Sequence, residues 1–122
     1  IEVEMLEQLV NQFVIPAAIA QRTAACADVA AQASVFGAHS VDRTHATLLH
    51  QTILELHKAH SMLKTSLKHN AKIDNEQEQA EHLALEVAPQ MDILRSHCDA
   101  LEELIEDSRW MLPKYREMLF QN

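Results

Sequence analysis

The sequence predicts an all-α protein: an antiparallel three-helix up-down-up bundle with a short aromatic C-terminal tail or fourth helical turn. Two observations predict this class. One glycine and three prolines in 122 residues leave few positions at which the chain can turn. Apolar residues recur at steps of three and four along most of the chain, and alternating β-branched runs are absent. We therefore expect a single helical domain over residues 1–122.

The first helix is expected over residues 1–36. Pro16 should kink this helix without ending it, because the apolar pattern continues beyond the proline. Gly37 can supply the left-handed stop at the C-terminal end. The positions expected to face the core are Val3, Leu6, Val10, Phe13, Ala17, Ala20, Ala24, Ala27 and Ala31.

The outer face of this first helix is unusually poor in charge. Only Arg22 and Asp28 are charged between residues 8 and 41. We expect a second buried face, with Ala25 on it, against a missing part of the protein or a neighbouring subunit. The alternative is that alanine simply permits close helix packing. The chain also opens on an apolar-periodic run without Met or an N-cap, so we expect it to be a fragment of a longer protein.

The second helix is expected over residues 42–70, with Ser40 or Asp42 as its cap. Its core stripe is predicted to comprise His45, Leu49, Thr52, Leu56, Ala59 and Leu63, flanked by Ile53, His60 and Leu67. Residues 70–75 are typical of a turn.

The third helix is expected over residues 75–107, capped by Asp74 or Asn75 and kinked at Pro89. Its apolar positions alternate at three and four residues, the spacing of a heptad seam. They are Ala84, Val87, Met91, Leu94, Cys98, Leu101 and Ile105.

The tail, residues 108–122, holds three of the chain's five aromatic residues. A free terminus is normally polar and frayed, so a terminus this apolar is expected to dock. The candidate docking residues are Trp110, Leu112, Tyr115, Leu119 and Phe120. Two interpretations stay open: a clasp on a partner, or a short fourth helix folded back on its own bundle.

Composition excludes several classes of function. The net charge of −8, without a basic stripe, argues against nucleic-acid binding. The longest weakly charged stretch, residues 8–41, is too rich in alanine and too interrupted for a membrane span. No secretory signal is visible. Two cysteines, Cys26 and Cys98, are too few for a disulfide framework, which favours a reducing cytoplasm.

The chain offers no recognisable catalytic, cofactor-binding or metal-binding pattern. Its eight histidines include no Glu-x-x-His or His-Glu-x-x-His motif, the patterns used for metal sites on helices. No glycine-rich phosphate loop, zinc spacing or nucleophile elbow is present. From the residues alone, this chain is not expected to be an enzyme.

One alternative function rests on His60. An acidic helical domain of this size could be a histidine phosphotransfer module, which presents a phosphorylatable histidine with a lysine three residues on and a glycine beside it. Here Lys64 lies four residues after His60, and Thr65 follows it where a small residue is needed. A further alternative is a freestanding helical interaction protein.

Both ends of the chain resemble the C-terminal helical region of type III glutamine synthetases. Near the start, the resemblance covers Ile1-Glu2, Met5 and Val14-Ile15-Pro16-Ala17-Ala18. Near the end, it covers Arg95, His97-Cys98-Asp99, Leu101-Glu102, Trp110, Pro113, Tyr115 and Glu117-Met118-Leu119-Phe120. The family commonly has proline directly after the tryptophan, whereas this chain has Met111.

The resemblance implies a parent enzyme that condenses glutamate with ammonia at the expense of ATP, with divalent metal ions, in a large cytoplasmic homo-oligomer. The catalytic, nucleotide and metal residues of that family lie upstream of this region. The resemblance therefore implies a non-catalytic structural or assembly domain here. Its partners would be the upstream catalytic domain and neighbouring subunits.

Overall fold

The computed structural model describes residues 2–105, and every regular element in this part of the chain is helical. The elements are α1 (Glu2–Leu9), the π turn η1 (Val10–Val14), α2 (Ile15–Phe36), the 3₁₀ turn η2 (Ala38–Ser40), α3 (Thr44–Ala71), α4 (Glu76–His82), the π turn η3 (Leu83–Val87) and α5 (Ala88–Leu104). They form three long helical segments, 2–36, 44–71 and 76–104. The all-α class with three helices is thus confirmed.

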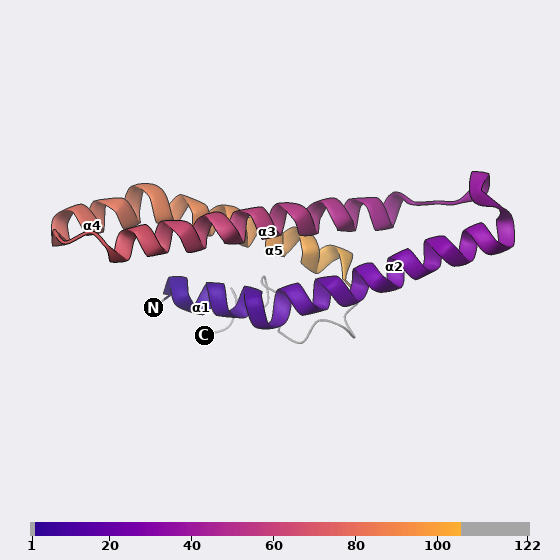
Figure 1. The fold of residues 1–122 in the computed structure, drawn as a ribbon, viewed down its shortest axis with the longest axis horizontal. Helices are drawn as coiled ribbons and strands as arrows, with labels where there is room; N and C mark the ends of the chain where they lie inside the picture. Colours follow the sequence, from indigo (N-terminus) through magenta and orange to yellow (C-terminus); the bar gives the residue numbers. More distant parts are fainter. Residues whose placement is uncertain (1, 106–122) are drawn as a thin grey trace.

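The chain reverses direction between the helical segments, as Figure 1 shows. At the first reversal, Gly37 has a φ of 84° and donates its N–H to the carbonyl of Ala33, as expected of a glycine that stops a helix. Asp42 accepts a hydrogen bond from the N–H of Thr44 at 3.0 Å, which also lowers the pKa of the Asp42 carboxyl. At the second, the Asn75 side chain caps α4 by accepting from Glu78 N–H at 3.0 Å.

Helix α3 packs against α2 on one side and α5 on another. Its fully buried side chains are Leu49, Ile53, Leu56 and Leu63. One expectation for this helix was wrong, because His45, placed on the core stripe, is exposed. Ile53 and His60, expected to flank the stripe, are buried with it. The other two helical segments contribute four more fully buried side chains to the core: Val10, Val87, Leu94 and Leu101.

The first π turn changes which alanines of α2 face the core. The N–H of Ile15 bonds to the carbonyl of Val10, five residues back, so the turn holds one residue more than an α-helical turn. Pro16 follows at once and has no N–H to donate. Ala17 is buried as expected, but the other buried positions, Val14, Ala18, Gln21 and Ala25, each follow an expected core position by one residue.

Several core assignments on this helix were therefore wrong. Ala20, Ala27 and Ala31 are exposed, and Ala24 is only half-buried. Ala25, which was expected on the outer face, lies in the core. The extra residue of the π turn rotates all later positions by about 100°. The sequence-based assignment assumed the same number of residues in every turn, so it missed this rotation.

The second π turn ends two residues before Pro89, just as the first ends two residues before Pro16. The N–H of Ala88 bonds to the carbonyl of Leu83, again five residues back. Ala84, expected on the heptad seam, is exposed, whereas Val87, Met91, Leu94, Leu101 and Ile105 are buried as expected. Helix α5 ends at Leu104, before the expected end at 107, because Ile105 has an extended backbone with ψ of 136°.

Candidate functional site

The five predicted docking residues of the tail, Trp110, Leu112, Tyr115, Leu119 and Phe120, lie outside the described residues. Their docking stays a prediction. The candidate site must therefore be built from the surface that residues 2–105 present.

His60 does not meet the needs of a phosphotransfer histidine. Its side chain lies between α3 and α1 and is only 6% exposed. The Nε2 atom is 3.7 Å from a carboxylate oxygen of Glu7. Burial lowers the pKa of His60, an effect that Glu7 opposes and that Lys64 and His57 reinforce. A phosphodonor could not reach this nitrogen without separating the two helices.

The remaining titratable groups do not converge on a metal site. Within residues 2–105, no group of three or more His, Cys, Asp or Glu side chains is placed to hold a metal ion. His82 instead helps to close the turn between α3 and α4. Its Nδ1 lies 3.1 Å from the amide nitrogen of Asn70, and its ring packs edge-on against His69 at 5.0 Å.

The two cysteines differ in their surroundings. Cys98 is partly buried in the α5 seam, and burial, with a smaller contribution from Asp99, raises the pKa of its thiol to about 12. Cys26 is exposed on α2. His97, next to Cys98 in the sequence, has its Nδ1 atom 3.8 Å from a carboxylate oxygen of Glu55. Cys26 lines a hollow between α2 and α3 together with Arg43 and His50.

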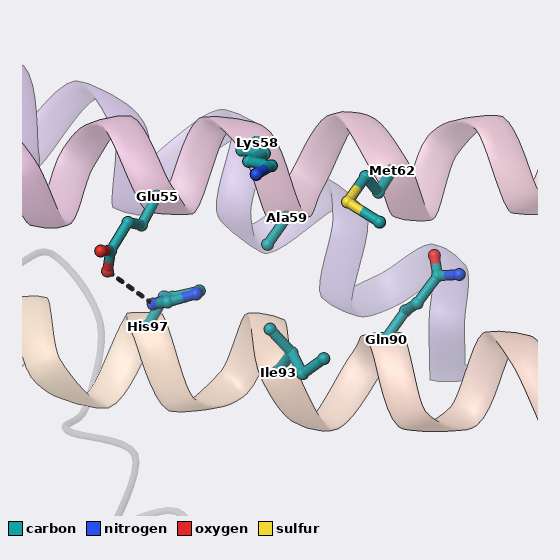
Figure 2. A pocket seen from close by; sticks show the side chains of 7 residues that line it. All are labelled: Glu55, Lys58, Ala59, Met62, Gln90, Ile93 and His97. Carbon is teal, nitrogen blue, oxygen red and sulfur yellow. Dashed lines mark ion pairs between the residues drawn. The ribbon is translucent and has the colours of Figure 1, made fainter.

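The hollow beside Cys26, between α2 and α3, has a volume of about 360 Å³. A further hollow, of about 350 Å³, lies between α3 and α5. We call it the α3–α5 groove, and it is lined by Glu55, Lys58, Ala59, Met62, Gln90, Ile93 and His97. Figure 2 shows these side chains along the two facing helices, with the helix 2–36 behind them. At one end of the groove, His97 Nδ1 lies 3.8 Å from a Glu55 carboxylate oxygen.

The floor of this groove is apolar and open. Met62 is 51% exposed and Ile93 is 53% exposed. Leu48, two helical turns before Glu55 on α3, is also exposed. Leu104, two turns after His97 on α5, is half-buried and packs against the core.

Sequence reasoning missed the α3–α5 groove. The available signal was that Met62 and Ile93 are large apolar residues outside the core stripes of their helices. A helix with a second apolar line beside its core stripe can pack against an additional helix. The groove combines three apolar side chains with four polar ones: Ala59, Met62 and Ile93 with Glu55, Lys58, Gln90 and His97.

The helix 2–36 presents further apolar surface. Ile19, Val35 and Phe36 are exposed, alongside the exposed alanines of α2. No helix among the described residues is long and apolar enough to cross a membrane.

Two curated proteins are similar to this chain. Type-3 glutamine synthetase of Dictyostelium discoideum is 29% identical over 126 aligned residues, which cover 98% of this chain and 17% of that protein. Glutamine synthetase of Bacteroides fragilis (strain YCH46) is 53% identical over 34 residues, which cover 28% of this chain and 5% of that protein. No family profile and no solved structure matches the chain.

These matches agree with the resemblance carried by the two ends of the sequence. The chain spans less than a fifth of the length of the curated relatives it matches. It is thus related in sequence to the C-terminal region of type III glutamine synthetases.

Proposed function

We propose that this chain is the non-catalytic C-terminal helical domain of a type III glutamine synthetase, with a structural or assembly role. The observation that carries the proposal is the match to type-3 glutamine synthetase, which covers 98% of this chain but 17% of the relative. The parent reaction would be the ATP-dependent condensation of glutamate and ammonia, a step of nitrogen metabolism in the cytoplasm. ATP and divalent metal ions would bind upstream.

The surface of the domain supports an assembly role. Large apolar side chains are exposed at several places, among them Val35 and Phe36 at the end of α2, Ile19 along it, and Met62 and Ile93 in the α3–α5 groove. Exposed apolar groups of this size mark contacts with other protein surfaces when they gather on one face. In the parent enzyme, the partners would be the upstream catalytic domain and neighbouring subunits.

The packing of α3 against both neighbouring helical segments supports an up-down-up bundle as the architecture of this domain. The burial of His60 disfavours the phosphotransfer alternative, because a histidine that exchanges phosphoryl groups must be reachable by two other proteins.

The proposal is tested in the complete protein that contains this chain. Glutamine formation from glutamate, ammonia and ATP is measured together with the mass of the assembly by sedimentation velocity. Removal of residues 1–122 is expected to reduce the assembly to smaller species. Failure of the complete protein to make glutamine would contradict the parent activity, and an unchanged assembly after truncation would contradict the assembly role.

The phosphotransfer alternative has a separate readout. Incubation of the chain with a small phosphodonor is expected to leave His60 unmodified. Acid-labile phosphate on His60, absent from His60→Gln, would reinstate that alternative.

A further inference from the structure

The turn between α3 and α4 closes one end of the bundle and is held by side chains from both helices (Figure 1). Asn70, in the last turn of α3, is 8% exposed. Its side-chain nitrogen Nδ2 donates to the carbonyl of Gln79 at 3.0 Å, and the Gln79 side chain donates back to the Asn70 carbonyl at 3.1 Å. The same Nδ2 atom lies 3.1 Å from Nδ1 of His82. One buried amide therefore joins α3 to two positions of α4.

The contact between Asn70 and Gln79 fixes the protonation of His82. The Gln79 carbonyl can only accept a hydrogen bond, so the Asn70 atom that faces it must be the nitrogen and not the oxygen. The amide nitrogen only donates, so Nδ1 of His82 must accept and carries no proton. In the closed turn His82 is thus neutral, with its proton on Nε2.

A proton added to His82 disrupts this arrangement. A charged imidazole carries a proton on both ring nitrogens, so Nδ1 then faces the Asn70 amide group as a second donor. Rotation of that amide by half a turn would restore the bond to His82, but it would place the amide oxygen against the carbonyl oxygen of Gln79. In either case one hydrogen bond is lost, and because Asn70 is buried, water replaces it poorly.

Other charged groups surround His82 at this end of the bundle. They are Glu78 and Glu86, each four residues from His82 on its own helical segment, and Lys68, His69 and Lys72 at the end of α3. The carboxylates attract a charged ring, whereas the lysines repel it. His69 packs edge-on against His82 at 5.0 Å, so two charged rings would also repel each other. A test must therefore distinguish a proton on His82 from a proton on His69.

We infer that the turn between α3 and α4 is a proton-sensitive clasp, closed when His82 is neutral and opened when His82 gains a proton. Opening releases Asn70 from α4 and allows residues 76–82 to unfold locally, while α3 stays packed against α5. The inference concerns contacts at one turn of the chain, so it stands or fails separately from the proposed role in a glutamine synthetase.

Nuclear magnetic resonance of the 122-residue chain tests the clasp directly. The background is His60→Gln, which removes the buried histidine of the core. At pH 7.5, the nitrogen chemical shifts of His82 should show a proton on Nε2 and none on Nδ1. As the pH is lowered to 5, the side-chain amide signals of Asn70 should shift with the same midpoint as the His82 ring. A proton on Nδ1 at pH 7.5, or Asn70 signals that do not follow His82, would overturn the inference.

Hydrogen exchange in the same background measures the opening of α4. Protection factors of the α4 amides, which correct for the intrinsic effect of pH on exchange, should be about two- to tenfold lower at pH 5.5 than at pH 7.5. This factor corresponds to the loss of one net hydrogen bond. Amides in the middle of α3, near Leu56, should keep their protection. An equal loss along α3 and α4 would contradict a local clasp.

Two variants assign the proton. His82→Leu removes the acceptor and should leave α4 weakly protected at both pH values. His69→Gln is the matched control, because it removes the other histidine of the turn and keeps the contact between Asn70 and His82. This control should retain the pH dependence of α4. If His69→Gln abolished that dependence and His82→Leu retained it, the controlling proton would be on His69 and the inference would be wrong.

Discussion

The imidazole Nε2 of His60 lies 3.7 Å from a carboxylate oxygen of Glu7 and joins the middle of α3 to α1. At this separation the atom makes no hydrogen bond within residues 2–105, although it is buried from water. A charged imidazole is therefore poorly compensated at this position, and Glu7 offsets only part of the cost of its burial. The neutral ring is the form that the fold accommodates.

This relationship predicts that the fold loses stability in mild acid. The pKa of His60 is below its ordinary value of 6.5 in the folded chain, so the unfolded chain binds more protons as the pH falls. The contribution of neutral His60 to the free energy of unfolding is fully present above about pH 6.5. It is lost as the pH decreases toward the lowered pKa of the folded chain. Urea unfolding between pH 7.5 and 5 should show the loss, and His60→Gln should make it smaller.

The control for this experiment is His39→Gln, which removes an exposed histidine at the turn before α3. It should leave the pH dependence of the wild type unchanged. A His60→Gln variant with the same pH dependence as the wild type would show that protonation of other groups controls acid stability.

Substitution of Leu94 tests how much the core side of α5 contributes to stability. Its side chain is fully buried, so Leu94→Ala should lower the free energy of unfolding by about 2–5 kcal/mol. Leu54→Ala, at a half-exposed position, should change it by no more than about 0.5 kcal/mol. Thermal or urea unfolding followed by circular dichroism measures both. A neutral Leu94→Ala would contradict the burial of this residue.

The two cysteines should react with thiol reagents at very different rates. The pKa of Cys98 is raised to about 12, so at pH 8 its thiolate fraction is about a thousandfold below that of a thiol with the reference pKa of 9.0. Iodoacetamide should therefore modify exposed Cys26 first, and Cys98 only after urea is added. Mass spectrometry of the digested chain distinguishes the sites. Equal labelling without urea would mean that the α5 seam is open.

The outer face of α2, which is poor in charged residues, should support association between copies of the chain. Ala27→Glu places a charge at an exposed position of this face and is expected to reduce self-association in sedimentation equilibrium. Ser61→Glu, at an exposed position of α3, serves as the matched control. A wild-type chain that is monomeric at every concentration would contradict an interface between copies at this face.

The all-helical class and the relationship to glutamine synthetase could be predicted from the sequence because their signals are local. Gly37 and Asn75 mark helix ends through backbone requirements that few other residues meet. The heptad seam of α5 placed Met91, Leu94 and Leu101 in the core correctly. In each case the evidence lies within a few residues of the feature.

The α3–α5 groove could not be predicted in the same way, because its position depends on which faces of two helices meet. Met62 and Ile93 are thirty-one residues apart, and neither has a distinctive neighbour in the sequence. Similarly, the burial of His60 follows from the approach of α1, which the pattern of α3 does not specify. The docking of the tail residues, including Trp110, stays a prediction, because these residues lie outside the described part of the chain.

Because of the two π turns, the structural effect of deleting one residue depends on its position along these helices. Each holds one residue more than an α-helical turn, so loss of an exposed residue such as Gln12 together with Pro16→Ala would leave a regular helix of the same hydrogen-bonding direction. Loss of a residue of α2 between Pro16 and Gln21 would instead rotate the buried Gln21 and Ala25 relative to the preceding core positions. Relatives of different length are therefore expected to carry their single-residue gaps just before these two prolines, where the fold can absorb them.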